Sequence, residues 1–408
     1  MEAFAPDPQT HRHQMTSPRI LLIICTLLVA LAGRASDSIT VSLATCYPGG
    51  DIYELEGHSA LVISEPGRPD VAVTYGMFDF NAPHFVYRFV KGETDYMVGL
   101  VDWQRFKYAY EREGRRVITQ RLNLTPEQTA RLLARVSDDL RPENSTYRYN
   151  YVYDNCATRP LRAILAAYAP DSVTMGATTW EAAGDQYSFR DVMRCYHANY
   201  PWYQFGIDLA LGSGIDYPLH PSQLAFCPME LRDMLAGATI NGCPVVTSED
   251  VAVDIPAGYM VAAPTPWPLR PLTVCWAVFI VIATICIYDL RRGNVTRIAD
   301  TIYFTIAALA GCLIAFLVFI SVHEATSPNA LIWWLNPFCF IPAIFIWLKK
   351  LKIFVFSYEI INFVVVFALI IASPWLHQSF NPAFYPLMLA DIALSARYIL
   401  LTYNKIKK

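Results

Sequence analysis

The sequence predicts an exported α+β domain followed by an all-α membrane domain of five transmembrane helices. Of the 408 residues, 54% are hydrophobic and only 16% are charged, which is more apolar than a water-soluble chain of this length. Charged residues and Gly/Pro turns are spread through the first 265 residues, whereas long apolar runs fill the rest. The net charge of −3 excludes the strongly basic surface that nucleic-acid binding requires.

An apolar run near the N-terminus, from Ile20 to Ala32, follows two arginines and ends in small residues. The run is too short to span a bilayer comfortably, and its ending is compatible with cleavage. We therefore predict a signal peptide over residues 1–35, with an uncleaved anchor as the alternative. Both alternatives place residue 36 onward outside the cytoplasm.

Residues 36–265 have the pattern of a globular domain. The segment "HSALVIS" is expected to form a strand beginning at His58, and the Glu65–Gly67 turn pairs it with "VAVTYG". A helix is predicted after Thr125, which has an N-cap side chain and is followed by Pro126 at the first helical position. Five prolines between Pro256 and Pro271 then mark the transition, with a linker over 266–271.

Five apolar segments make up the predicted membrane domain, residues 272–408. The spans are 272–290, 301–322, 330–348, 353–372 and 383–401. Each has about the length that a bilayer requires. Basic residues follow the first, third and fifth spans: Arg291, Arg292, Arg297, Lys349, Lys350, Lys352, Lys405, Lys407 and Lys408. Because cytoplasmic loops carry the excess of Lys and Arg, the globular domain and the two other loops are expected on the outer face.

Five cysteines lie in the exported domain: Cys46, Cys156, Cys195, Cys227 and Cys243. Disulfides are expected in an oxidising compartment, and an odd number leaves at least one free thiol. Cys227 and Cys243 flank a helical stretch and are candidates for one bridge. The pairing of the others stays open, and several free thiols are an alternative.

Cys156 ends the aromatic run "YRYNYVYDNC" and precedes a helical segment. A helix N-terminus lowers the pKa of a thiol and offers backbone N–H groups to a developing oxyanion. A nucleophilic cysteine also needs a base, and His58 at the start of a strand is the candidate. Considered alone, a strand histidine is usually structural. Cys46 precedes a turn, so burial or pairing is expected for it instead.

The order Gly-His-Ser-Ala-Leu on a strand, then Asn-Cys before a helix, resembles the circularly permuted papain-like fold of NlpC/P60 and LRAT-type thiol enzymes. The stretches "CYPGGDIYELEGHSALVI", "YGMFDFNAPHFVYRFVKGETDYMV", "LNLTPEQ" and "YRYNYVYDNCATRP" more closely resemble the Lnb family of Bacteroidota. With the five spans, the resemblance covers residues 40 to 401. It implies a lipoprotein N-acyltransferase of the inner membrane, with its catalytic domain in the periplasm.

The resemblance implies Cys156 as nucleophile and His58 as base, and Asp79 is the candidate that orients the imidazole. Asn155 and Arg159 flank the thiol and are candidates for an oxyanion donor and a phosphate ligand. Their alternative roles are a helix start and a salt bridge. Tyr53 is a weaker candidate for the same site.

His323 and Glu324, at the outer end of the second span, are candidate head-group contacts. The tryptophans Trp333 and Trp334 are explained as an interfacial belt. The sequence has neither the Cys/His spacing of a zinc site nor a phosphate-binding glycine loop, so no metal and no cofactor are expected.

The resemblance implies that a phospholipid donates an acyl chain to the thiol, which passes it to the amine of a diacylglyceryl-cysteine lipoprotein. Two alternatives belong to other classes. One is a membrane-tethered cysteine peptidase or amidase that acts on cell-wall peptides. The other is a non-enzymatic scaffold, for which Cys156 and His58 would be dispensable.

Overall fold

The computed structural model describes residues 39–79, 82–182 and 186–406, and the predicted signal peptide lies outside them. The chain divides into two compact units. The sheet unit comprises Met1–Phe89, Glu93–Tyr187 and Leu219–Ala262, and the membrane unit comprises Val90–Gly92, Ser188–Pro218 and Ala263–Lys408. Each unit is described separately below.

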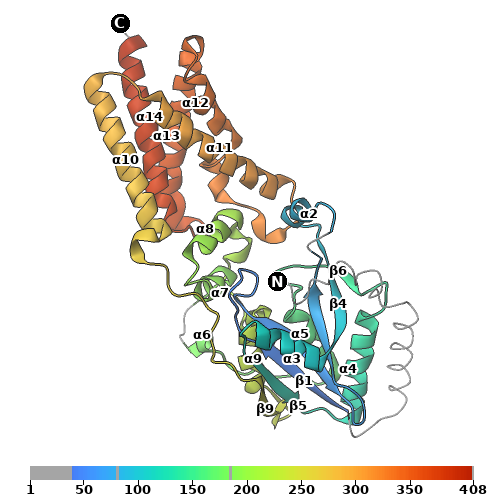
Figure 1. The fold of residues 1–408 in the computed structure, drawn as a ribbon. Helices are drawn as coiled ribbons and strands as arrows, with labels where there is room; N and C mark the ends of the chain where they lie inside the picture. The colour runs from blue at the N-terminus through green and yellow to red at the C-terminus, as the bar shows by residue number, and fades with distance from the viewer. Residues whose placement is uncertain (1–38, 80–81, 183–185, 407–408) are drawn as a thin grey trace. The chain divides into compact units, whose positions relative to one another are not determined.

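The sheet unit is built on a seven-stranded antiparallel sheet in the order β6-β4-β3-β2-β1-β5-β9 (Figure 1). The strands are β1 Thr40–Cys46, β2 His58–Ser64, β3 Val71–Met77, β4 Asp95–Asp102, β5 Val117–Leu122, β6 Thr146–Arg148 and β9 Val246–Val253. A small ribbon of β7, Thr239–Ile240, and β8, Cys243–Pro244, lies apart. The central strands are rich in β-branched residues and are almost wholly buried, as expected for strands covered on both faces. The predicted strand at His58 and its partner are confirmed.

Helices cover both faces of this sheet. Helix α3, Trp103–Arg112, packs its aromatic side chains against Ala44, Ala60 and Val62 on one face. Three helices cover the other face of the sheet: α4 Pro126–Asp139, α5 Thr158–Tyr168 and α9 Pro228–Ala236. Tyr75 of β3 donates a hydrogen bond to Asp139 of α4 at 2.9 Å, which ties this layer to the sheet.

The N-terminus of α4 is fixed by the residues that predicted it. The Thr125 hydroxyl accepts from the Gln128 backbone N–H, and the Gln128 side chain accepts from the Thr125 N–H. This reciprocal capping satisfies two N–H groups that a helix otherwise leaves without partners. The predicted helix is therefore confirmed, with Pro126 as its first residue.

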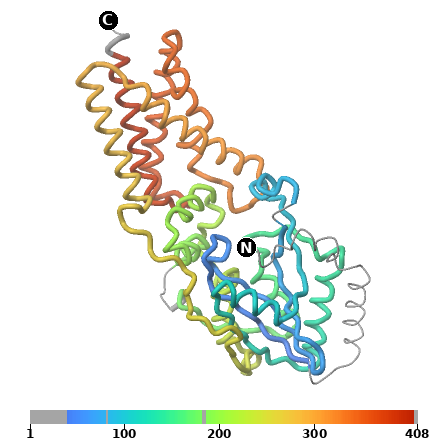
Figure 2. Tube along the Cα trace, in the orientation of Figure 1, coloured from blue at the N-terminus to red at the C-terminus, as the bar shows by residue number. Residues whose placement is uncertain are grey.

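Four helices of the membrane unit are long and apolar enough to cross a bilayer. They are α10 Pro271–Arg292, α11 Arg297–Phe319, α13 Lys352–Ala372 and α14 Phe384–Ile406. Helix α14 packs beside both α10 and α13 (Figure 1, Figure 2). These helices correspond to four of the five predicted spans.

The third predicted span, 330–348, is not one continuous helix. It consists of η5 Ala330–Trp333, η6 Pro337–Cys339 and the short α12 Phe340–Phe345. Pro337 cannot donate a backbone hydrogen bond to the preceding turn, and the Asn336 side chain caps the new start by accepting from Phe338 N–H. The backbone of Asn336 also lies so close to Gly311 that a Cβ there would approach it to 2.3 Å.

Residues 188–218, expected in the exported domain, group with the membrane unit. They form α7 Phe189–Tyr196, α8 Pro201–Ala210 and the turn η1 Ser213–Ile215. Fully buried Arg190 binds Asp208 at 2.9 Å and Asp216 at 2.6 Å. Asn381, just before α14, donates to the same Asp208 at 2.8 Å. Buried ion pairs therefore hold this segment together, and a hydrogen bond joins it to the loop before α14.

Candidate active site

Cys156 lies two residues before α5, in the turn that connects the aromatic run to the helix. Its neighbour Asn155 forms this turn. The Asn155 side-chain oxygen accepts from the Ala157 and Thr158 backbone N–H groups at 2.8 and 2.9 Å. This contact caps the helix and sets the position of the thiol between the cap and the first helical turn.

The Asn155 amide has no hydrogen left for an oxyanion. Its nitrogen donates to the carbonyls of Tyr151 at 2.7 Å and Phe226 at 2.8 Å, and the residue is only 4% exposed. An amide nitrogen has two hydrogens, and both are used. Asn155 therefore stabilises the start of the helix, which was its alternative predicted role. Its amide does not have a hydrogen available for an oxyanion.

Arg159 is also held by the protein. Its guanidinium makes two hydrogen bonds to Asp154, at 2.9 and 2.7 Å, and lies over the Tyr147 ring with 3.3 Å from Cζ to the ring centroid. Asp154 is shared with Arg162 at 2.7 Å. These contacts correspond to the salt-bridge role and brace the turn before Cys156. Phosphate binding by Arg159 stays a prediction.

Three groups lie near enough to the Cys156 sulfur to favour its ionised form and so lower its pKa: the backbone N–H of Ser59, the hydroxyl of Tyr149 and the backbone N–H of Cys156 itself. Gly76 of β3 lies beside it, where a Cβ would come 3.7 Å from the Cys156 Cβ and 3.2 Å from the Tyr149 ring. Any side chain at Gly76 would crowd the thiol, and its φ of +87° also favours glycine.

Burial raises the pKa of the Cys156 thiol to about 11, although the three donors act in the opposite direction. The sequence analysis expected the helix N-terminus to lower this pKa. Desolvation disfavours the thiolate more than the donors favour it, and Asn155 already caps the nearest helical N–H groups. The resting site therefore holds a neutral thiol.

His58 begins β2, directly before the residue whose N–H reaches Cys156. Its ring nitrogen Nε2 lies 2.7 Å from the Thr74 hydroxyl on β3. Burial, together with the positive charge of nearby Arg115, lowers the pKa of His58 to about 3. The β2–β3 pairing ends at Ala60 with Thr74, two residues after His58. The His58 ring therefore lies against β3 at Thr74.

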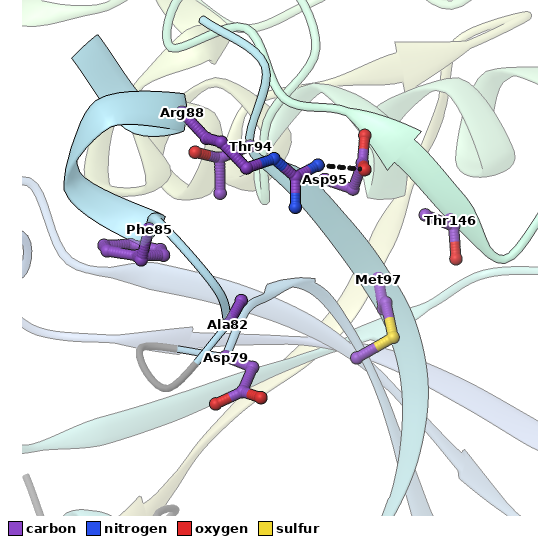
Figure 3. Close-up of a pocket in the computed structure, with 8 residues that line it drawn as sticks. All are labelled: Asp79, Ala82, Phe85, Arg88, Thr94, Asp95, Met97 and Thr146. Carbon is purple, nitrogen blue, oxygen red and sulfur yellow. Dashed lines mark hydrogen bonds and ion pairs between the residues drawn. The ribbon is translucent and has the colours of Figure 1, made fainter. Parts of the chain in front are cut away.

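Two other candidates, Asp79 and Tyr53, also belong to the sheet unit. Exposed Asp79 lines a cavity of about 190 Å³ together with Phe85, Arg88 and Met97 (Figure 3). The orienting role of Asp79 stays a prediction, and Thr74 is the residue that the structure offers for it. The hydroxyl of Tyr53 donates to Asp51 at 2.7 Å on the exposed loop before β2.

His323 and Glu324 belong to the membrane unit. Glu324 begins the short η4, Glu324–Thr326, and its carbonyl lies near Gly214, while the His323 backbone and ring lie near Gly92. The two residues follow α11, where the sequence analysis expected them. Their contact with a head group stays a prediction.

All nine cysteines in the described part of the chain are free, so the bridge considered between Cys227 and Cys243 is wrong. Cys227 is fully buried with its sulfur 3.8 Å from the Glu56 carbonyl, whereas Cys243 is exposed. Cys46 is buried, as expected, and burial raises its pKa to about 12. Within the described ranges, no group of three or more His, Cys, Asp or Glu residues could hold a metal ion.

Sequence reasoning missed Ser59, Thr74 and Tyr149. The sequence contained a signal for Ser59 and for Thr74. Ser59 follows His58 on the predicted strand, and Thr74 lies in the predicted partner strand at a position that the correct register would have indicated. Tyr149 stands in an aromatic run in which nothing local distinguishes one tyrosine from another.

The fold and the site define a class: a membrane protein that carries an α+β domain with a buried thiol before a helix and a histidine at the start of a central strand. Comparison with known families then gives the family. A model of the Lnb N-terminal periplasmic domain matches residues 31–186, and a model of the Lnb transmembrane domain matches residues 263–406. The chain belongs to the Lnb family, so the resemblance is confirmed and the sheet unit is a periplasmic domain. No curated protein and no solved structure shows a significant match to the chain.

Proposed function

We propose that this protein is a lipoprotein N-acyltransferase of the inner membrane that works through a thioester on Cys156. The observation that carries the proposal is the thiol with three donors at its sulfur in a chain with both Lnb domains. Membership of this family favours a role in lipoprotein maturation. A membrane domain of several apolar helices also fits substrates that are themselves lipids.

In the first half-reaction, Cys156 Sγ attacks the carbonyl carbon of a phospholipid ester and its proton moves to His58. Thr74, by accepting from Nε2–H, would leave Nδ1 free as the base. The new S–C bond forms, the ester C–O bond breaks, and the leaving alkoxide takes the proton from the imidazolium. The products are a lysophospholipid and the acyl thioester.

In the second half-reaction, the α-amine of a diacylglyceryl-cysteine lipoprotein attacks the thioester carbonyl. The N–C bond forms, the C–S bond breaks, and the amine proton returns to the sulfur through His58. In both halves the carbonyl oxygen becomes negative. The N–H groups of Ser59 and Cys156, which already converge on the sulfur, are the donors that would stabilise it.

The neutral state of the pair is compatible with this chemistry. Burial keeps the thiol protonated and the imidazole uncharged before substrate arrives. Proton transfer then accompanies attack, and the donors act on charge that develops only at that moment. A preformed thiolate is not required.

The test is the acyl adduct itself. Full-length protein, purified in detergent and mixed with phospholipid, is expected to gain the mass of one acyl chain on Cys156. The Cys156→Ala protein should gain none, while Cys46→Ser, which removes another buried free thiol of the same unit, should still be acylated.

The peptidase reading is tested in the same samples. Cleavage of a cell-wall peptide by the wild-type protein, with no acyl adduct and no N-acylated lipoprotein, would replace the proposal with that reading. A non-enzymatic scaffold predicts that Cys156→Ala cells keep fully N-acylated lipoprotein N-termini by mass spectrometry.

A further inference from the structure

A row of aromatic rings leads from the Cys156 thiol to the exposed surface of the sheet unit. The aromatic row consists, in order from the thiol, of Tyr149, Tyr96, Phe78, Phe85 and Phe89. Successive ring centroids lie 4.3, 5.0, 5.7 and 6.0 Å apart. Tyr149 lies beside Cys156, because a Cβ at Gly76 would come 3.2 Å from its ring and 3.7 Å from the Cys156 Cβ. The row is therefore continuous at van der Waals and stacking distances.

The outer end of the aromatic row is its most exposed part, whereas Tyr96 is buried and the Tyr149, Phe78 and Phe85 rings are half-buried. Cys156 and Tyr96 are 8% and 9% exposed, whereas Phe89 at the far end is 48% exposed. A row that served only as core packing would be buried throughout. Its far rings instead leave apolar surface open, which is costly in water unless something apolar covers it.

The far end of the aromatic row is the short helix α2, Phe85–Lys91, which has no buried residue. Val86 and Tyr87 beside its rings are 73% and 55% exposed. The last residues of this helix belong to the membrane unit. There the Ser321 hydroxyl donates to the Val90 carbonyl at 2.9 Å, and Val322 N–H donates to the Lys91 carbonyl at 2.9 Å, just after α11. Within the membrane unit, Val90 and Lys91 are therefore held at the end of α11.

The cavity of about 190 Å³ lies along the same row (Figure 3). Phe85 of the row is in its wall, and Met97, an adaptable apolar side chain, contributes from β4. Ala82 forms part of the wall with a single methyl group, which leaves the space open. The Arg88–Asp95 ion pair, 2.8 Å long, borders the cavity from α2 and β4.

We propose that the aromatic row and this cavity bind the acyl chain of the phospholipid donor, with α2 as the entry at the membrane surface. The inference rests on the proposed function and adds the acyl-chain subsite to it. A chain whose carbonyl reaches Cys156 must lie against Tyr149, and the row continues that apolar surface outward. The exposed rings at α2 are where a chain leaving the bilayer would first be covered.

The experiment compares two donors, dioctanoyl- and dipalmitoyl-phosphatidylethanolamine, in mixed micelles with the full-length protein. The readout is the initial rate of acyl adduct formation on Cys156. Phe78→Ser and Phe85→Ser are each expected to lower the rate with the long-chain donor roughly tenfold, because each ring covers several methylenes. The rate with the short-chain donor should change by less than about threefold, because fewer of its methylenes reach these rings.

Three further variants separate binding from folding. Ala82→Phe leaves all five rings in place but fills the cavity, and it should also slow the long-chain donor selectively. Phe89→Ser removes the outermost ring of the row, and Tyr108→Ser is its control because it removes an exposed ring from α3 of the same unit. Tyr108→Ser should change neither rate. Tyr149 is left intact because it contacts the sulfur.

Equal loss of rate with both donors would overturn the acyl-chain subsite, since damage to the fold or to the thiol does not depend on chain length. Unchanged rates in Phe78→Ser and Phe85→Ser would overturn it as well. If the wild-type protein forms no acyl adduct on Cys156 with either donor, the proposed function is refuted, and the subsite with it. The two failures are thus distinguishable.

Discussion

Replacing Thr74 with valine tests which residue orients the candidate base. Valine keeps the shape of threonine but removes the hydroxyl that lies 2.7 Å from His58 Nε2. Thr74 is 6% exposed, so water does not readily replace the lost partner. Leaving a buried ring nitrogen unsatisfied costs about 1–3 kcal/mol of folding free energy.

The effect on rate is a separate quantity. Without Thr74 the imidazole is free to rotate, and a displacement of about 1 Å from the reacting atoms costs roughly a hundredfold in rate. That factor corresponds to about 2.7 kcal/mol in the activation free energy. We therefore expect Thr74→Val to remain folded and to form the Cys156 adduct roughly a hundred times more slowly.

The assay is the single-turnover rate of adduct formation by intact mass, with thermal unfolding in detergent as the measure of folding. Thr74→Ser restores the hydroxyl and should recover most of the rate. Asp79→Asn is the competing variant, because the sequence analysis assigned the orienting role to Asp79. A wild-type rate in Thr74→Val together with a large loss in Asp79→Asn would refute the reasoning.

Two further predictions concern stability. Because the folded-state pKa of His58 is lowered to about 3 from 6.5, the unfolded chain binds a proton that the folded protein does not, and stability falls as pH drops below 6.5. At pH 4.5 this loss of folding free energy is at most about 2.7 kcal/mol. The melting temperature of His58→Gln should therefore fall less between pH 7 and 4.5 than that of the wild-type protein. Equal falls in both proteins would contradict a lowered pKa for His58. Arg190→Met leaves the Asp208 and Asp216 carboxylates buried without their main partner, so it should destabilise the membrane unit by about 3–5 kcal/mol. An unchanged melting temperature in detergent, with Arg232→Met as the surface control, would show that the buried network is not needed for stability.

The sequence by itself determined the features that depend on neighbouring residues. Alternation and a turn predicted the β2–β3 pair, and the Thr125–Gln128 pattern predicted the start of α4, because both are short-range effects. Apolar length predicted five membrane spans, and four of them are single long helices, since a bilayer sets the required length directly. The family also followed from the order of motifs, although each motif alone is weak.

Only the tertiary structure decided which groups meet at Cys156. Ser59 is nearly a hundred residues away in sequence, and its N–H reaches the sulfur only because the sheet and the α5 turn pack in one register. Thr74 is the observed hydrogen-bond partner of His58 for the same reason, since strand register selects one side chain among several polar ones. Burial, which a local pattern does not measure, reversed the expected direction of the thiol pKa. The distance between two cysteines is likewise a tertiary property, and no disulfide joins Cys227 to Cys243.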